Sequence, residues 1–324
     1  MKTRSRLAVL GTALLLAIGA AGPAVAQSYP NKPVRIIVAY PAGQGTDVVT
    51  RYIADRLGKA MGQNFFVENR PGAGANLGTE AAARAAPDGY TLTMGTNATH
   101  GTNEFLYDKL TFDPEKDFEP IILIGSFPMV IAANPSYPPN NLQEMVALAK
   151  SQPKAGDVAM PSTTARIVFE LLKSRTQAPL LGVPYKGSSA AMTEVMGGQL
   201  PLTIDTVTAV RSQVASGKLK PLAVTSSQPT PLLPGVKPVA DQGFPGFEVI
   251  AWNALYAPKG TPREIVNAIN AELAKILAQP ETVQKLHELG FDAVGGSPEK
   301  LAEFGRSERQ KWGPLIKSAG MKAE

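Results

Sequence analysis

A glycine-containing loop near the start of the sequence has the composition of an anion-binding turn. It reads YPAGQGTD over residues 40–47 and separates an apolar β-branched run from a stretch with helical spacing. Glycine permits a tight turn, free N–H groups at a helix start favour negative charge, and Thr46 or Asp47 is expected to cap that helix. A plain tight turn fits the same residues equally well. The candidate ligand-binding residues in this loop are Tyr40, Gly43, Gln44, Gly45, Thr46 and Asp47.

Polar residues also follow three later segments that predict strands. Thr96 and Asn97 follow residues 90–94, and Asp205 ends the run 200–204. A third group, Ser162, Thr163, Thr164 and Arg166, follows residues 157–160. Ligands of open α/β sheets bind outside the carboxyl ends of strands, so all of these residues are candidates for one site. Structural alternatives remain open: turn formation, helix capping by the hydroxyls or by Asp205, and a surface pair of Arg166 with Glu170.

The strength that binding requires indicates that a single loop is insufficient. Micromolar affinity needs about 8 kcal/mol. One helix terminus contributes about 0.3–2 kcal/mol, and each hydrogen bond to a charged group about 1.5–3 kcal/mol. Loops from different parts of the chain must therefore converge on the anion and exclude water.

The elements that would position these loops follow an α/β pattern with mainly parallel strands, because β-branched runs alternate with amphipathic helical stretches. The first strands are predicted at 34–38, 65–67 and 90–94, and the first helices over 49–60 and 77–85. Residues 69–76 also contain glycines and fit a second anion-binding turn. We favour the alternative, a packed turn in which Arg70 pairs with a nearby carboxylate. Two strands are then predicted close together at 121–124 and 129–132, because Gly125, Ser126 and Pro128 interrupt the apolar run.

A second series of strands and helices occupies the middle of the chain. Its strands are predicted near 157–160, 182–185, 200–204 and 221–225, and its helices near 142–150, 167–175, 190–196 and 207–214. The run 249–257 predicts a return crossing, followed by helices over 263–278, 281–289 and 298–319 and a short strand at 291–294. A chain that leaves a lobe and returns forms a hinged pair with a ligand cleft between the lobes. We expect lobe 1 to comprise residues 27–125 and 252–324, and lobe 2 residues 126–251.

The first 26 residues are typical of a signal peptide. Lys2, Arg4 and Arg6 precede a short apolar stretch, and Ala24-Val25-Ala26 suits cleavage before Gln27. With no cysteine in the chain, the mature protein has neither an acylated N-terminus nor disulfides. Removal of residues 1–26 leaves 29 Lys and Arg against 27 Asp and Glu, a net charge of +2. These charges form no basic run, which argues against nucleic-acid binding. We expect a periplasmic monomer.

Residues for catalysis or metal binding are scarce. The chain has two histidines and no cysteine, and it contains neither a Gly-x-Ser-x-Gly elbow nor a His-Glu-x-x-His motif. The acidic run at 113–119 lacks the glycine and the final glutamate of an EF-hand, and we interpret it as a solvated loop. We therefore expect no enzymatic activity, no metal and no cofactor.

Taken in order, the loops of this sequence resemble the substrate-binding receptors of tripartite tricarboxylate transporters, the Bug or TctC family. The resemblance covers essentially the whole chain after residue 26. The matching segments are residues 29–35 (YPNKPVR), 41–47 (PAGQGTD), 67–73 (VENRPGA), 86–92 (APDGYTL), 183–187 (VPYKG), 222–225 (LAVT), 257–262 (APKGTP) and 295–298 (GGSP).

This resemblance implies a two-lobed type II periplasmic binding-protein fold, of the Venus-flytrap kind, with two crossover strands. It also implies capture of an organic carboxylate, a dicarboxylate or tricarboxylate with aromatic acids included, for a permease with one large and one small membrane subunit. An orphan receptor that presents its ligand to a periplasmic sensor domain is the alternative. In the family, the loop matching residues 40–47 holds one carboxylate end, partly through ordered waters, and the segments at 96–97, 162–166 and 205 complete the site.

Two residues depart from the family pattern. Gln44 stands where the family usually has a third glycine, and Arg166 stands where many members have histidine or a neutral residue. We expect Arg166 to add a cationic contact that favours a ligand with two negative charges.

Overall fold

The computed structural model describes residues 29–318 and 320–323. The predicted signal peptide at residues 1–26 lies outside this range. Contacts divide the chain into two units, residues 1–31 and 32–324, and the second contains every described helix and strand. In the described part of the chain, no helix combines the length and the apolar character needed to cross a bilayer.

Each lobe has a small parallel sheet at its centre. In the first, β1 (Val34–Val38) lies between β2 (Phe65–Asn69) and β3 (Thr91–Thr96). In the second, β5 (Asp157–Met160) lies between β6 (Leu181–Pro184) and β7 (Leu202–Thr206). Of these strands, β1, β3, β5 and β7 are short and mostly buried, as expected for parallel strands inside a covered sheet. The edge strands β2 and β6 are partly exposed.

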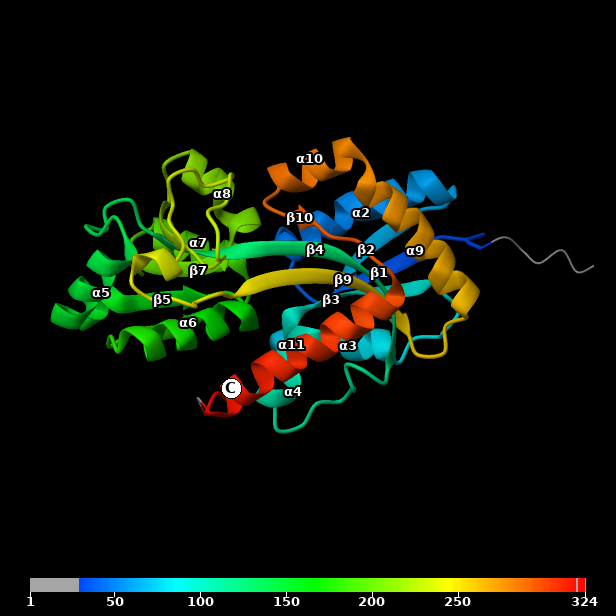
Figure 1. Cartoon of the computed structure of the whole chain (residues 1–324), viewed down its shortest axis with the longest axis horizontal. Helices are drawn as coiled ribbons and strands as arrows, with labels where there is room; N and C mark the ends of the chain where they lie inside the picture. The colour runs from blue at the N-terminus through cyan, green and yellow to red at the C-terminus, as the bar shows by residue number, and fades with distance from the viewer. Residues whose placement is uncertain (1–28, 319, 324) are drawn as a thin grey trace, which may run out of the picture. The chain divides into compact units, whose positions relative to one another are not determined.

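Two long antiparallel strands join the lobes, β4 (Phe118–Ala133) and β9 (Ile250–Pro258), and they run side by side through the centre of Figure 1. Residues Phe118–Pro128 of β4 pair with β9, and from Met129 onward β4 pairs with β7 and β8 (Lys220–Val224). The two lobes with two crossover strands confirm the predicted fold class. Among the described strands, every antiparallel pair contains β4 or β9, so the prediction of mainly parallel strands holds only inside the lobes.

The prediction of two separate strands at 121–124 and 129–132 was wrong, because β4 is one strand of 16 residues. Gly125 does not break it. The short strand β10 (Asp292–Ala293) pairs there, and a Cβ on Gly125 would overlap the carbonyl oxygen of Asp292. Pro128 lies where β4 changes pairing partners, a position at which a missing N–H donor is tolerated.

The helices flank the sheets. In the view of Figure 1, α2 and α10 lie above the strands of the first lobe, α9 runs diagonally down beside them, and α3, α4 and α11 lie below. Their bounds are α2 (Gly45–Met61), α3 (Asn76–Ala83), α4 (Asn103–Leu106), α5 (Leu142–Ser151), α6 (Thr163–Thr176), α7 (Ser188–Met196), α8 (Val207–Ala215), α9 (Arg263–Ala278), α10 (Pro280–Glu288) and α11 (Pro298–Ser318). Helix α4 and the π-helical turn η2 (Ala98–Thr102) before it were not predicted, since both are short and follow a polar segment without helical periodicity.

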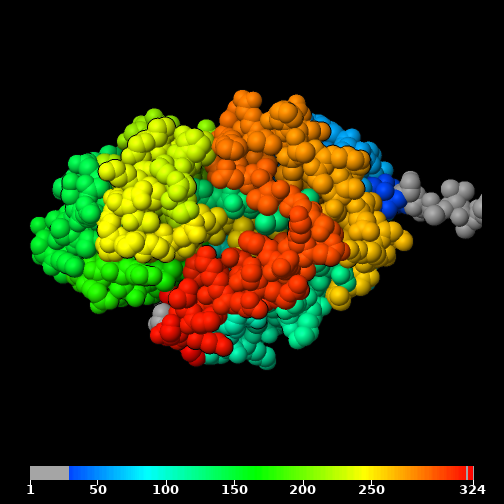
Figure 2. All heavy atoms as spheres, in the orientation of Figure 1, coloured from blue at the N-terminus to red at the C-terminus, as the bar shows by residue number. Residues whose placement is uncertain are grey.

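Each lobe has its own hydrophobic cluster. The first groups Ile37, Phe118, Trp252 and Tyr256 with Leu301 of α11, and the second groups residues of β4, α7 and α8. Figure 2 shows the corresponding masses, with the green and yellow segments at one end and the blue, orange and red segments at the other. Each lobe therefore has apolar packing of its own.

Candidate ligand-binding site

A small inner cavity of about 30 Å³ lies where the two lobes meet. Nine of the predicted site residues line it: Tyr40, Gln44, Gly45, Thr46, Thr96, Asn97, Ser162, Thr164 and Asp205. They come from both lobes, as the argument from binding strength required. Sequence reasoning missed five further lining residues, Phe127, Met129, Thr206, Ala251 and Trp252.

Three helices begin at this inner cavity. Helix α2 starts with Gly45 and Thr46, α6 follows Ser162, and α8 follows Thr206. The first N–H groups of a helix have no partner within the helix, and its N-terminus carries partial positive charge. With 17, 14 and 9 residues, all three helices are long enough to have a substantial dipole. Their convergence directs three partial positive charges at the inner cavity, and none of the described residues that line this cavity is cationic.

The structure shows which residues cap these three helices, which the sequence left open. Ser162 accepts a hydrogen bond from the amide of Ala165 at 3.2 Å, and Thr206 accepts one from Ala209 at 3.1 Å. The residue that caps α8 is therefore Thr206 and not Asp205. The prediction that Thr46 or Asp47 caps the first helix was wrong, because Gln44 occupies the N-cap position and makes no side-chain capping hydrogen bond. The start of α2 thus keeps its amides free of a capping side chain.

Asp205 is the one carboxylate among the residues that line the inner cavity, and it is only 2% exposed. Its Oδ1 accepts a hydrogen bond from the amide of Thr206 at 2.7 Å, while Oδ2 has no partner among the described residues. Burial raises the pKa of Asp205 to about 6, and the neighbouring Ser188 hydroxyl and Thr206 amide oppose this rise. This carboxyl group can therefore exchange a proton near neutral pH.

Direct contacts between the lobes surround the inner cavity. Nε2 of Gln44 donates to the carbonyl oxygen of Pro161 at 3.3 Å, and the hydroxyl of Thr164 donates to Oδ1 of Asn97 at 3.1 Å. A Cβ added to Gly45 would lie 2.8 Å from Oγ1 of Thr206, closer than real contacts allow. The lobes are therefore closed around this point, and small residues permit the approach.

A larger outer cavity of about 610 Å³ adjoins the inner one, since Tyr40, Gln44 and Ser162 line both. Two more predicted residues, Thr163 and Arg166, line it together with the aromatic rings of Tyr107 and Tyr185 and the side chain of Lys186. The guanidinium group of Arg166 makes no ion pair or hydrogen bond with a described residue, so the surface pair with Glu170 does not form. Arg166 therefore faces the cleft.

Two predicted residues, Gly43 and Asp47, line neither cavity. The carboxylate of Asp47 instead accepts hydrogen bonds from the amide of Gly43 at 2.9 Å, from Asn69 at 2.8 Å and from Arg51 at 3.0 Å. Burial acts to raise the pKa of Asp47, but the hydrogen bonds from Arg51, Gly43 and Asn69 outweigh it and lower the pKa. Asp47 thus holds the shape of the 40–47 loop. In the neighbouring loop, Arg70 pairs with Glu68 as expected, but residues 71–75 line the outer cavity, so this loop also faces the cleft.

Asp47→Ala is expected to lower the free energy of unfolding by about 2–4 kcal/mol at neutral pH, because it leaves several donors to a buried carboxylate without an acceptor. A carboxyl group with a lowered folded pKa stabilises the fold above its ordinary pKa of about 4, and this contribution is lost as the pH falls through the folded pKa. In denaturant unfolding, the difference in the free energy of unfolding between the wild type and Asp47→Ala should therefore be smaller at pH 3 than at pH 7. Asp55→Ala, which removes an exposed pair with Lys59, is the control, and an equal loss for both variants would contradict the role of Asp47.

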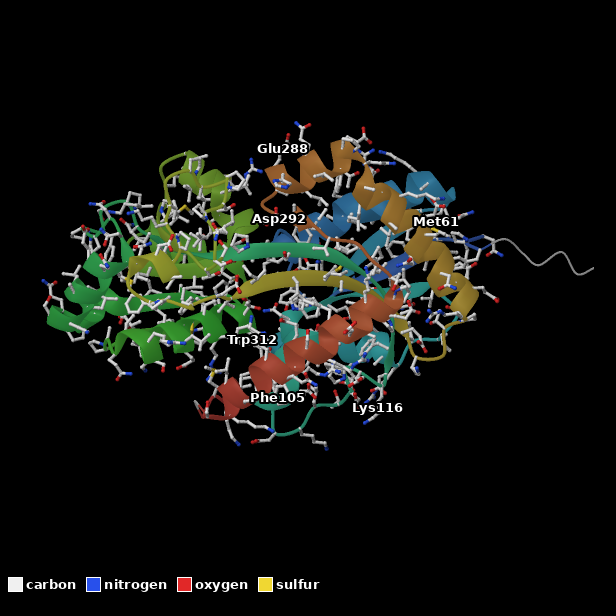
Figure 3. All side chains as sticks on the ribbon, viewed as in Figure 1. Met61, Phe105, Lys116, Glu288, Asp292 and Trp312 are labelled. Carbon is white, nitrogen blue, oxygen red and sulfur yellow. The ribbon has the colours of Figure 1, made fainter. Side chains whose placement is uncertain are left out.

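Hydrogen bonds to helix α11 hold one wall of the inner cavity in place. Trp252 of β9 lines the cavity, and its Nε1 donates to Oε2 of Glu308 at 2.8 Å. Nε1 of Trp312 donates to the same oxygen at 3.0 Å. Glu308 and Trp312 are buried residues of α11, and Trp312 is labelled in Figure 3 close to Phe105, where α11 packs on α4. The last helix therefore fixes a ring that faces the site.

Comparison with known proteins places this geometry in a family. The tripartite tricarboxylate transporter family receptor model, TctC, matches residues 49–321. Protein BugT of Bordetella pertussis is 33% identical over 321 residues, which cover 98% of each chain. A protein of R. palustris solved with adipate superposes with a TM-score of 0.88 at 32% identity, covering 91% of this chain and 99% of that one.

MatC from Rhodopseudomonas palustris, solved with bound malate, has a TM-score of 0.83 at 32% identity and covers 89% of this chain and 100% of its own. These matches extend over both lobes and over the crossover strands. They agree with the resemblance drawn from the sequence motifs. The chain belongs to the TctC or Bug family, the receptors of tripartite tricarboxylate transporters.

Proposed function

We propose that this chain is a periplasmic solute-binding protein that captures a small organic carboxylate, a dicarboxylate or tricarboxylate with aromatic acids included, by closure of its two lobes. The observation that carries the proposal is the convergence of the N-termini of α2, α6 and α8 on the inner cavity. Three such termini with hydroxyl groups from both lobes could together supply the roughly 8 kcal/mol of micromolar binding, whereas one could not. The relatives solved with adipate and with malate support the same class of ligand.

The binding is proposed to be non-covalent, without catalysis. His100 is fully buried, stacks on Tyr256 with ring centroids 4.0 Å apart, and contacts Thr99 through Nδ1 at 2.9 Å. Burial, with the charge of Arg309, lowers the pKa of His100 to about 3, so the ring stays neutral within the core. Among the described residues, no cluster of metal-ligating side chains is present. The site can therefore hold an anion, and it offers no activated nucleophile.

The direct test is calorimetric titration of the mature protein with a panel of organic acids, preceded by a thermal-shift screen. A ligand that binds only the folded state raises the melting temperature. At least one dicarboxylate or tricarboxylate should bind with micromolar or better affinity and be recovered unchanged. Failure of every acid in the panel to bind, or conversion of the bound acid to a product, would contradict the proposal.

We further propose that residues 1–26 direct secretion and are removed, and that the mature protein delivers its ligand to the membrane subunits of a tripartite transporter. Deletion of the protein should then abolish uptake of the best ligand by intact cells. If deletion leaves uptake unchanged and instead removes a transcriptional response to the ligand, the protein presents its ligand to a sensor domain.

Ligand affinity is expected to fall as the pH rises above 6. Asp205 lines the inner cavity, so a ligand carboxylate held there would lie beside it, and burial raises the pKa of Asp205 to about 6. A bound anion favours the protonated form of Asp205. Above the pKa of Asp205, binding therefore requires uptake of a proton, and the affinity falls by up to about tenfold per pH unit. Titrations between pH 5 and pH 8 measure this slope. Asp205→Asn, which cannot ionise, should bind with little pH dependence, and equal slopes in both proteins would show that Asp205 does not face the ligand.

A further inference from the structure

The charges of the outer cavity are distributed unevenly. Arg166 projects into it from the first turn of α6, and Lys186 lies at its exposed rim, while no Asp or Glu is among its described lining residues. Arg166 is half-buried, and its guanidinium group has no ion pair or hydrogen bond with a described residue. A cation withdrawn from water without a partner is unfavourable, and an arginine in such a place is suited to receive a carboxylate through two parallel hydrogen bonds.

The hydroxyl groups of Tyr107 and Thr163 line the same outer cavity as Arg166. A Cβ added to Gly74 would overlap the hydroxyl of Tyr107 and would lie 3.2 Å from Oγ1 of Thr163, so these two groups approach the same point from opposite lobes. Burial raises the pKa of Tyr107, and the charge of Arg166 opposes this rise, which places the cation close to the phenol. The region around Arg166 therefore combines a fixed positive charge with hydrogen-bond donors.

Much of the wall of the outer cavity is apolar. Its walls include Pro41, Leu106, Met160 and Pro184, and the inner cavity itself has room for little more than one carboxylate-sized group. The body of a ligand whose first carboxylate occupies the inner cavity must therefore lie along this apolar surface. A chain of methylene groups or an aromatic ring suits such a surface, whereas hydroxyl groups along it would lose hydrogen bonds to water.

We propose that Arg166, with Lys186 at the rim, forms a second anion-binding subsite, and that the ligand is an extended dicarboxylate with an apolar spacer. This inference rests on the proposed function, because it assigns the first carboxylate to the inner cavity. It specifies that Arg166 and Lys186 bind the second carboxylate of the ligand. It also excludes compact, hydroxylated acids as the preferred ligand.

Matched ligand pairs test the subsite by calorimetric titration. The pairs are adipate with hexanoate, suberate with octanoate, and 1,4-benzenedicarboxylate with benzoate, which differ within each pair in the second carboxylate. For the pair that binds most tightly, the dicarboxylate is expected to bind about 30-fold more tightly than the monocarboxylate, the effect of one hydrogen-bonded charge pair. Galactarate, which has the length of adipate with four hydroxyl groups on the spacer, should bind at least tenfold more weakly than adipate.

Arg166→Gln should reduce the dicarboxylate preference to within about threefold by weakening the dicarboxylate alone, since the inner cavity still holds the monocarboxylate. Arg175→Gln removes the same charge from an exposed position on the same helix and should change neither affinity. An unchanged preference in Arg166→Gln, or equal weakening of both ligands, would overturn the subsite while leaving the proposed function intact. If the wild-type protein binds another acid of the wider panel but none of these dicarboxylates, the subsite alone is overturned. If it binds no acid of the wider panel, the proposed function is overturned as well.

Discussion

Glu308→Leu is expected to lower the free energy of unfolding by about 2–5 kcal/mol, because it leaves two buried indole N–H groups without an acceptor. Both tryptophans of the chain, Trp252 and Trp312, donate to the same carboxylate oxygen of this 9% exposed residue. Leucine fills a similar volume and cannot replace the hydrogen bonds. Denaturant unfolding followed by tryptophan fluorescence reports directly on this cluster.

The same change should also weaken ligand binding, since Trp252 forms part of the inner cavity. Glu308→Gln keeps an acceptor oxygen for the indoles and is the matched control, with an expected loss of about 1 kcal/mol. If the two variants unfold at the same denaturant concentration, the shared carboxylate does not brace the site.

Gly45→Val is expected to weaken binding of the best carboxylate by about 10- to 100-fold, because overpacking costs about 1–3 kcal/mol and would be relieved by separating the lobes. The position is the first residue of α2, where valine meets no backbone restriction, and its Cβ would stand against Oγ1 of Thr206 and Cβ of Thr208 in the opposite lobe. Thr206 cannot simply rotate away, because its hydroxyl caps α8.

Calorimetric titration measures this effect, and unfolding in the absence of ligand should change little because each lobe keeps its own core. Gly305→Ala on α11, where an added Cβ would make only ordinary contacts, is the control with unchanged affinity. Gly45→Ala should fall between the wild type and Gly45→Val. Full affinity in Gly45→Val would show that ligand capture does not need the close approach of α2 and α8.

The sequence predicted most of this fold because its elements are locally encoded. Helix α9 has the predicted bounds, and β1 coincides with the β-branched run at 34–38. The predictions of secondary structure failed where tertiary contacts determine whether a strand continues. Gly125 and Pro128 resemble strand breakers in isolation, yet β4 continues through them because β10 and a change of pairing partner accommodate both residues.

The site could be predicted only in part for the same reason. The types of Thr164 and Asp205 marked them as candidates, but only the fold brings their loops together. Phe127, Met129 and Trp252 were missed because apolar residues of a crossover strand look like core residues in the sequence. The signal that could have found them is their position at the hinge, beside the predicted interruption of β4. The sequence of α6 was equally consistent with two positions of the Arg166 side chain, a surface ion pair with Glu170 and a place in the cleft.

The most direct measurement of the central claim is a crystal structure of the mature protein with its tightest-binding carboxylate. One carboxylate should lie in the inner cavity, with oxygens about 2.7–3.2 Å from N–H or hydroxyl groups at the starts of α2, α6 and α8, or joined to them through one water. A carboxylate held only by Arg166 and Lys186, or a ligand bound outside the closed lobes, would contradict the claim that helix N-termini from both lobes hold the anion.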